Sequence, residues 1–179
     1  GDDTKGWIVR AEIKGDGGFG PLERYLATKE ATNVDAPVGL TLSDKGHLVV
    51  GQMGEITVPN DGLLTFYNAK TKKMLLNLET GLHDITALVY SPKGHLYALD
   101  FAWAKPEDAG LYRLDAEGAG KDQQIKPVKI VALKKPAAMA FGADGALYIA
   151  VFGETEGDAE DADKEKAATG QVIKLEPGL

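Results

Sequence analysis

Three stretches of the sequence repeat one another: PVGLTLSDKGHLVVGQM at 37–53, ITALVYSPKGHLYALDF at 85–101 and PAAMAFGADGALYIAVF at 136–152. In each stretch, two runs of apolar, β-branched and aromatic residues flank a polar turn that contains a glycine. Such runs are typical of β-strands, and the glycine supplies the positive φ that a tight turn needs. Each stretch therefore predicts a β-hairpin. The three turn glycines are Gly46, Gly94 and Gly145, which lie 48 and 51 residues apart.

Further strand-like runs follow each hairpin. A third run begins just after a glycine in every unit, and a fourth run is present in the first two units. The third runs are LLTFYNA at 63–69, LYRLDA at 111–116 and QVIKLE at 171–176, and their glycines are Gly62, Gly110 and Gly170. The fourth runs are KKMLLNLET at 72–80 and PVKIVAL at 127–133. Four antiparallel strands in about 50 residues form one blade of a β-propeller.

The repeated pattern of a proline, alternating apolar residues and a Gly-x-Leu step resembles the NHL-type repeat. The chain is similar to the superfamily of six-bladed propellers that also holds the SMP-30/gluconolactonase-like proteins. Among bacterial members it is most similar to the ScyD/ScyE-like propellers. The resemblance implies an all-β fold, a β-propeller of four-stranded antiparallel blades, with about three and a half blades in this chain.

The repeat divides the chain into four parts of one partial propeller domain. We expect residues 1–34 to hold the last two strands of a preceding blade, 35–84 and 85–133 to form two blades, and 134–179 to form a blade that lacks its fourth strand. Six blades of this size would need about 290 residues. An open half-ring leaves strand edges unpaired.

Three arrangements would deal with those edges. The chain can be the C-terminal half of a longer propeller, it can associate with a second chain, or its own N-terminal strands can complete the last blade. We expect association, with a homodimer or another chain closing the ring.

The composition excludes several kinds of site and partner. The chain has no cysteine, which rules out disulfides, thiolate nucleophiles and cysteine-based metal sites. Its formal net charge is −7, with seven acids in 154–165, so we expect no nucleic acid or membrane partner. A protein or a small polar ligand is the expected partner. The residues leave the cellular location open, and we favour a periplasmic or extracellular one.

The hexapeptide GDGGFG at 15–20 matches the G-x-G-x-x-G pattern of dinucleotide-binding turns. Nothing downstream alternates strand with helix, as a dinucleotide-binding unit requires. GDGGFG instead separates GWIVRAEI at 6–13 from ERYLATKE at 23–30, where a third strand would connect to a fourth. We therefore predict the loop of an outer hairpin, and a helix over 21–31 would contradict this prediction.

The resemblance implies that ligands bind on the face carrying the links between blades and the loops from second to third strands. These loops are 51–62, 100–110 and 152–170, and they are long for hairpin connections. Long loops on a rigid scaffold often carry function. The candidate ligand-binding residues on this face are Gln52, Glu55, His83, Asp84, Asp100, Phe101 and Trp103.

Asp100 is the candidate for a metal ligand. Its carboxylate could bind a divalent cation such as calcium or orient a polar ligand, or it could cap the turn by accepting backbone N–H bonds. We match it to Gln52 and Phe152 in the neighbouring units, and these three residue types make a poor metal site. The acids of 154–166 lack the spacing of a calcium-binding EF-hand and favour a solvated insertion.

The other candidates also have two interpretations. Phe101 and Trp103 could stack on a sugar or peptide, or could fold back over the blade. His83 could act as a base or ligand, or could be a solvent-exposed link residue. His47 and His95 recur with the repeat, which favours a structural role.

We therefore expect a non-enzymatic β-propeller that binds a protein or ligand and needs no cofactor. One alternative is an SMP-30/gluconolactonase-like metal-dependent hydrolase. The other is a structural half-propeller that completes its ring by association. The sequence shows no H-E-x-x-H motif and no recognisable Ser-His-Asp order, so it identifies no catalytic residue.

Overall fold

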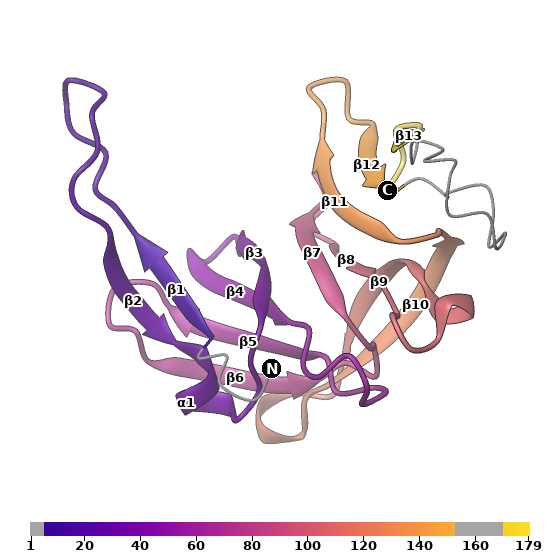
Figure 1. Ribbon diagram of the computed structural model, residues 1–179, viewed down its shortest axis with the longest axis horizontal. Helices are drawn as coiled ribbons and strands as arrows, with labels where there is room; N and C mark the ends of the chain where they lie inside the picture. Colours follow the sequence, from indigo (N-terminus) through magenta and orange to yellow (C-terminus); the bar gives the residue numbers. More distant parts are fainter. Residues whose placement is uncertain (1–5, 153–169) are drawn as a thin grey trace, which may run out of the picture.

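The fold is nearly all β, as the sequence predicts. A computed structural model describes residues 6–152 and 170–179 (Figure 1). It contains four antiparallel sheets, each made of strands that are consecutive in the chain. None of the helices in the described part of the chain is long and apolar enough to cross a membrane.

Two of the sheets have four strands, one has three and one has two. The two-stranded sheet is the N-terminal hairpin, with β1 (Trp7–Arg10) and β2 (Glu23–Ala27). Blade 1 has β3 (Pro37–Leu42), β4 (His47–Gln52), β5 (Leu63–Asn68) and β6 (Met74–Glu79). Blade 2 has β7 (Ile85–Tyr90), β8 (Leu96–Asp100), β9 (Gly110–Glu117) and β10 (Gln124–Ala132). Blade 3 has β11 (Pro136–Phe141), β12 (Leu147–Val151) and β13 (Gln171–Leu175). The short helices are α1 (Thr28–Thr32), η1 (Pro106–Asp108) and η2 (Gly120–Asp122).

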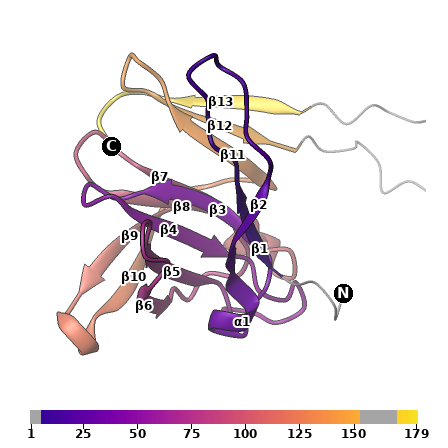
Figure 2. The same ribbon diagram turned by 90° about the vertical axis from the view of Figure 1, so that its left-hand side faces the viewer.

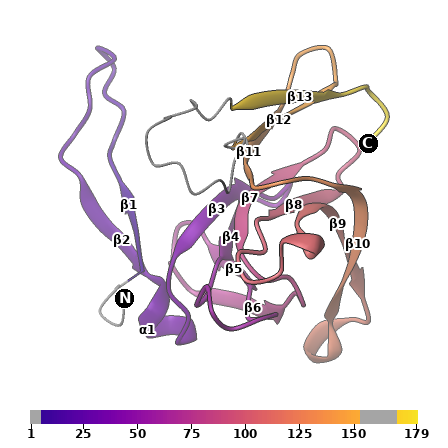
Figure 3. The same ribbon diagram turned by 45° about the vertical axis from the view of Figure 1, so that its right-hand side comes forward.

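The blades lie side by side, and the first strand of each blade is its inner strand. β3 contacts β7, and β7 contacts β11, so the inner strands of the three blades are neighbours (Figures 1 and 3). Within each four-stranded blade the strands follow in chain order, from the first to the fourth. This arrangement is that of a β-propeller, and it confirms the predicted fold class.

The apolar core lies between neighbouring sheets. One cluster joins blades 1 and 2 and includes Val49, Leu64 and Leu88. A second joins blades 2 and 3, and a third packs the N-terminal hairpin against blade 1 through Ile8 and Tyr25. Each blade is therefore stabilised mainly by the blade next to it.

The predicted turns have the predicted geometry. Gly46, Gly94 and Gly145 have φ values of 70°, 83° and 77°, which L-residues with a side chain rarely adopt. In the first turn the Gly46 N–H donates to the Ser43 carbonyl at 2.9 Å, and the same bond recurs in the other two turns.

GDGGFG connects two antiparallel strands, as predicted. β1 pairs with β2, and an isolated bridge between Ile13 and Phe19 extends the hairpin towards its tip (Figure 2). The expected strand over 23–30 is too long, because it ends at Ala27 and α1 follows. The Thr32 hydroxyl donates to the Thr28 carbonyl, and Asn33 ends the helix with a φ of 63°. This turn of helix redirects the chain towards β3.

Close approach between blades requires glycine at position 51. A Cβ atom on Gly51 would lie 2.5 Å from the Ile85 Cγ2 and 3.2 Å from the Leu88 Cδ1. Any larger residue would therefore push blades 1 and 2 apart.

Gly51→Val is expected to lower the free energy of unfolding by about 1–3 kcal/mol, because the added atoms overpack this contact. Urea denaturation would measure the loss. Gly15→Val is the matched control, since a Cβ on Gly15 meets no atom within 4 Å. The control is expected to change the free energy by less than about 0.5 kcal/mol. Equal effects of the two substitutions would show that blade contact does not control stability.

Candidate functional site

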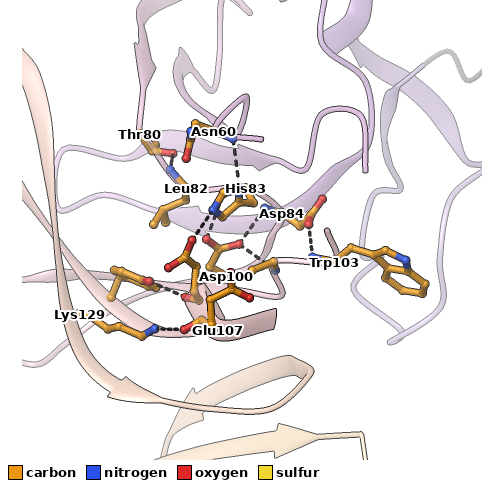
Figure 4. Close-up of polar contacts among 12 residues, drawn as sticks. Asn60, Thr80, Leu82, His83, Asp84, Asp100, Trp103, Glu107 and Lys129 are labelled. Atoms are coloured by element: carbon orange, nitrogen blue, oxygen red, sulfur yellow. Dashed lines mark hydrogen bonds and ion pairs between the residues drawn. The ribbon is translucent and has the colours of Figure 1, made fainter. Parts of the chain in front are cut away.

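The loops from two blades meet the link between them on one face of the molecule. The link residue His83 is the meeting point (Figure 4). Its Nδ1 accepts the Asn60 N–H from the β4–β5 loop at 3.1 Å, and its Nε2 lies 3.2 Å from the Asp108 Oδ2 in the β8–β9 loop. With Nδ1 as an acceptor, the ring proton sits on Nε2 and donates to Asp108. His83 is only 5% exposed, so the interpretation as a solvent-exposed link residue is wrong.

Asp100 caps the backbone of this link. Its Oδ2 accepts the His83 N–H at 3.0 Å, and its Oδ1 accepts the N–H groups of Asp84 at 2.8 Å and Ala102 at 3.1 Å. The side chain is fully buried at the end of β8. The capping interpretation therefore describes what this carboxylate does in the structure.

Asp84 fixes the start of the next loop. Its Oδ2 accepts the Trp103 N–H at 2.6 Å, and its carbonyl accepts the Phe101 N–H at 2.9 Å (Figure 4). Between the two aromatic residues, Ala102 is buried and has a φ of 50°, a left-handed conformation that costs an alanine energy. Buried contacts hold the loop in this conformation.

Three aromatic rings gather beside this turn. Phe101 and Trp103 are stacked, with ring centroids 5.0 Å apart and an angle of 18° between the planes. Phe152, which follows β12 in blade 3, meets Phe101 edge-on at 6.1 Å. Trp103 is 58% exposed, so the ring does not fold back beneath the blade surface. We call Phe101, Trp103 and Phe152 the aromatic platform.

Gln52 is buried at the end of β4 and binds neighbouring groups of the chain. Its Nε2 donates to the Val34 carbonyl and to the Thr32 hydroxyl, and its Oε1 accepts from Thr65 at 3.3 Å. Glu55, in contrast, is exposed on the β4–β5 loop. The structure therefore does not bring these two predicted residues together with the His83–Asp100 group.

The match between Asp100 and Phe152 needs correction. Asp100 pairs with Ile85, the first residue of β7, and the residue that pairs with Pro136, the first residue of β11, is Val151. The residue of blade 3 that corresponds to Asp100 is therefore Val151, and Phe152 corresponds to Phe101. Phe101 and Phe152, whose rings meet, therefore hold equivalent positions in neighbouring blades.

A cavity of about 670 Å³ opens on the same face, next to blade 1. Its polar lining includes Lys29, Asn33, Asp35, Glu55, Thr57 and Asp61. Asp61 lies over Gly54, where a Cβ atom would come within 2.5 Å of all three carboxyl-group atoms. Its Oδ2 accepts the Glu55 N–H at 2.8 Å, and its Oδ1 is buried with no partner in the described part of the chain.

Burial raises the pKa values of three side chains on this face, Asp61, Asp84 and Tyr112. Burial raises the pKa of Asp61, and the negative charges of Glu55 and Asp35 raise it further against the effect of the Glu55 N–H. Burial also raises the pKa of Asp84, opposed by the Trp103 N–H and reinforced by Asp100 and Asp61. The pKa of Tyr112 rises to about 12, mainly through burial and also through nearby Asp100 and Asp108.

These residues do not fit a divalent cation. Both oxygens of Asp100 accept backbone N–H groups, and the Gln52 oxygen accepts from Thr65. The described residues contain no group of three or more acids or histidines that could hold a metal ion. The acids of 154–166 lie outside the described residues.

Sequence reasoning missed three of the groups that shape this face. Asp61, Asn60 and Asp108 lie in loops, and only the turn-like sequence Asn-Asp-Gly at 60–62 hints at a tight backbone there. Their roles depend on contacts between different loops, which no single stretch of sequence contains.

Solved structures with a similar fold are themselves β-propeller proteins. A luciferin-regenerating enzyme matches with a TM-score of 0.55 and 14% identity, over 96% of this chain and 52% of that one. A protein named a gluconolactonase matches with a TM-score of 0.54 and 14% identity, over 84% and 52% of the two chains. A third match is an oxidoreductase of glucose dehydrogenase type from Thermus, with a TM-score of 0.46, 19% identity and coverage of 65% and 38%.

The first two matches show the fold of the chain, that of a β-propeller. The chain spans about half the length of the first two structures. No protein-family model matches the sequence, and no curated protein matches it either.

Asp100→Ala is expected to lower the free energy of unfolding by about 3 kcal/mol or more, because three buried N–H groups lose their acceptor. Asp100→Asn keeps one acceptor oxygen and should cost less. Chemical denaturation would compare both with Asp44→Ala, a change in an exposed turn that should cost less than about 0.5 kcal/mol. Wild-type stability of Asp100→Ala would contradict the capping role.

The free energy of unfolding of Asp84→Asn is expected to rise relative to that of the wild type as the pH rises. The folded protein keeps the Asp84 proton to a higher pH than the unfolded chain, because burial raises the pKa of this carboxyl. Between the two pKa values the folded state binds more protons, so the wild-type free energy of unfolding falls as pH rises through that window.

The test is denaturation of both proteins at several pH values from about 3 to about 7, which spans the usual acid range. Asp16→Asn, in the exposed 14–20 loop, serves as the control for the loss of one negative charge. A difference between Asp84→Asn and the wild type that shrinks with rising pH would contradict the raised pKa.

Proposed function

We propose that this chain is a ligand-binding part of a β-propeller, and that a small polar ligand with a ring-shaped apolar face packs on the aromatic platform. The exposure of Trp103 carries this proposal. The ring is 58% exposed although its backbone is tied to the buried Asp84 and its face is stacked on Phe101. A large aromatic side chain that is exposed and rigid is suited to stacking on a sugar ring or a similar ligand.

The polar groups around the platform support binding more than catalysis. Asp84 and Asp100 use carboxylate oxygens to accept backbone N–H groups, and His83 is held between Asn60 and Asp108. The cavity near Glu55 and Asp61 offers further carboxylate groups for ligand hydroxyls or amines. A non-enzymatic function, without a catalytic residue or cofactor, follows from this assignment as part of the proposal.

The second candidate is an SMP-30/gluconolactonase-like hydrolase. The two matched structures with TM-scores above 0.5 favour it, since both bear enzyme names and one is named a gluconolactonase. At 14% identity this likeness supports the fold. The described residues do not form a cation site, so we assign no catalytic step to them.

The finer resemblance to NHL-type repeats and ScyD/ScyE-like propellers is part of the same proposal. It agrees with a repeat built from a Gly-x-Leu hairpin and a glycine-led third strand. We also propose a periplasmic or extracellular location on this resemblance. A purely structural half-propeller is the third candidate, and its open sheet edges are the observation that favours it.

Trp103→Ala is expected to weaken ligand binding about tenfold or more, because the stacking surface is lost. Isothermal titration with glucose, galactose, cellobiose and glucono-δ-lactone as probes would find the ligand and then measure the variant. Phe19→Ala removes an aromatic ring that is even more exposed, near the tip of the N-terminal hairpin, and it should leave binding unchanged. Equal weakening by both variants would contradict a site on the platform.

The hydrolase is tested by acid release from glucono-δ-lactone, with and without added calcium, manganese or zinc. We expect no hydrolysis above the uncatalysed rate. Cation-dependent turnover that survives Trp103→Ala would replace the binding proposal with the hydrolase. If no sugar probe binds and no turnover is measured, both the binding proposal and the hydrolase are contradicted. The structural half-propeller is then the remaining candidate.

A further inference from the structure

One apolar strand face is exposed in blade 1 although its counterparts are covered in the other blades. The repeat places Leu40 of β3 at the same position as Leu88 of β7 and Met139 of β11. Leu88 is 5% exposed and packs in the core between blades 1 and 2, and Met139 packs in the core between blades 2 and 3. Leu40 is 47% exposed. Val38 and Leu42, which alternate with it, are exposed as well.

On the same face of blade 1, the strands outside β3 are covered. Leu40 pairs with Val50 and Leu42 pairs with Leu48, so these side chains share one face of the sheet. Val50 is fully buried in the cluster that contains Ile8 and Tyr25 of the N-terminal hairpin. The hairpin therefore covers the outer strands of this face and stops short of β3.

The position of β1 explains where the cover ends. Gly6 precedes β1 as Gly62 precedes β5, and Gly110 is the first residue of β9, so β1 is a third strand and β2 a fourth strand. In blades 1 and 2 the third strand pairs on its inner side with the second strand. In the described part of the chain β1 pairs with β2 alone. Among the described strands, none pairs with its inner edge, which lies towards the exposed face of β3.

We infer that the open edge of β1 and the apolar ladder of Val38, Leu40 and Leu42 bind a pair of antiparallel β-strands of the same repeat type. The second strand of that pair hydrogen-bonds to β1, and the first strand covers Leu40. This docking extends the existing interface between the N-terminal hairpin and blade 1 towards the inner strand. It is independent of the aromatic platform, which lies on blades 2 and 3.

The contact between blades 1 and 2 shows what the partner strands need. Leu88 is covered by a strand pair that carries Gly39 and Gly51 at the contact, where Cβ atoms would approach it to 3.1 and 3.2 Å. Blade 2, whose strands cover Met139, has Ala87 and Leu99 at the same two positions. The partner strands therefore present a small residue at the first position and an apolar residue at the second.

A second copy of this chain fits the surface less well than such a strand pair. The last sheet of a copy has three strands, and its third strand, β13, would reach the place that β1 already holds. A strand pair without a third strand avoids this conflict. Closure by a homodimer, expected from the sequence alone, is therefore the competing outcome of the test.

The test uses a fluorescent peptide of residues 37–52, the strand pair that covers Leu88 within this chain, added to the whole chain. Fluorescence anisotropy should show saturable binding. Hydrogen exchange should show new protection of β1 amides. Leu40→Glu in the protein should weaken binding about tenfold or more, since a buried leucine contact becomes a buried charge.

Two controls make the result specific. Val172→Glu, an exposed apolar position on β13, should leave peptide binding unchanged. A peptide with Gly39→Val should not bind, because the added side chain would clash with the β3 ladder. Absence of saturable binding to the folded chain, or equal binding to Leu40→Glu, would overturn the inference. Light scattering that shows a dimer which Leu40→Glu dissociates would overturn it in favour of a second copy.

Discussion

The packing of each sheet against its neighbour is the contact on which the rest of the structure depends. Leu88 lies under Gly39 and Gly51, and these glycines allow the inner strands of two blades to approach closely. The core consists of separate clusters between sheets, as expected for a repeat architecture in which each unit contacts only its neighbours. Each blade therefore buries its apolar faces only where a neighbouring sheet covers them. The leucines of β3 are exposed because no described strand covers that part of blade 1.

The same packing determines which polar groups remain for function. It brings the link at 80–84 against two loops, and the buried backbone of that link must find hydrogen-bond acceptors. Asp100 and Asp84 supply them, and His83 joins Asn60 to Asp108. Residues that look like a polar binding site in the sequence are thus committed to holding the blades and loops in place. The aromatic platform is different, because its rings are fixed by this network and still face solvent.

The sequence predicts the blades well because each hairpin is encoded locally. Alternating apolar residues and a turn glycine are enough to define a hairpin, and the glycine before each third strand marks the next strand. Counting from the turn glycines would also have identified Val151, since Gln52, Asp100 and Val151 each lie six residues after one. The burial of His83 and the unpartnered oxygen of Asp61 could not be predicted in this way. They result from contacts between loops that are far apart in the sequence.

The proposed ligand site and the proposed docking surface are independent in physical terms. Phe101 and Trp103 belong to blade 2 and Phe152 follows β12 of blade 3, and the core between these blades includes the buried residues Leu99, Leu111 and Ile149. The platform therefore has its supporting contacts within this chain. The β3 ladder lies on the face of blade 1 that points away from blade 2, where no described strand covers it. A strand pair bound there would stabilise blade 1 and place another inner strand beside β3. It would not move the aromatic rings. Changes in ligand affinity after docking would therefore have to come from groups that the partner strands bring to the face, and not from rearrangement of the platform.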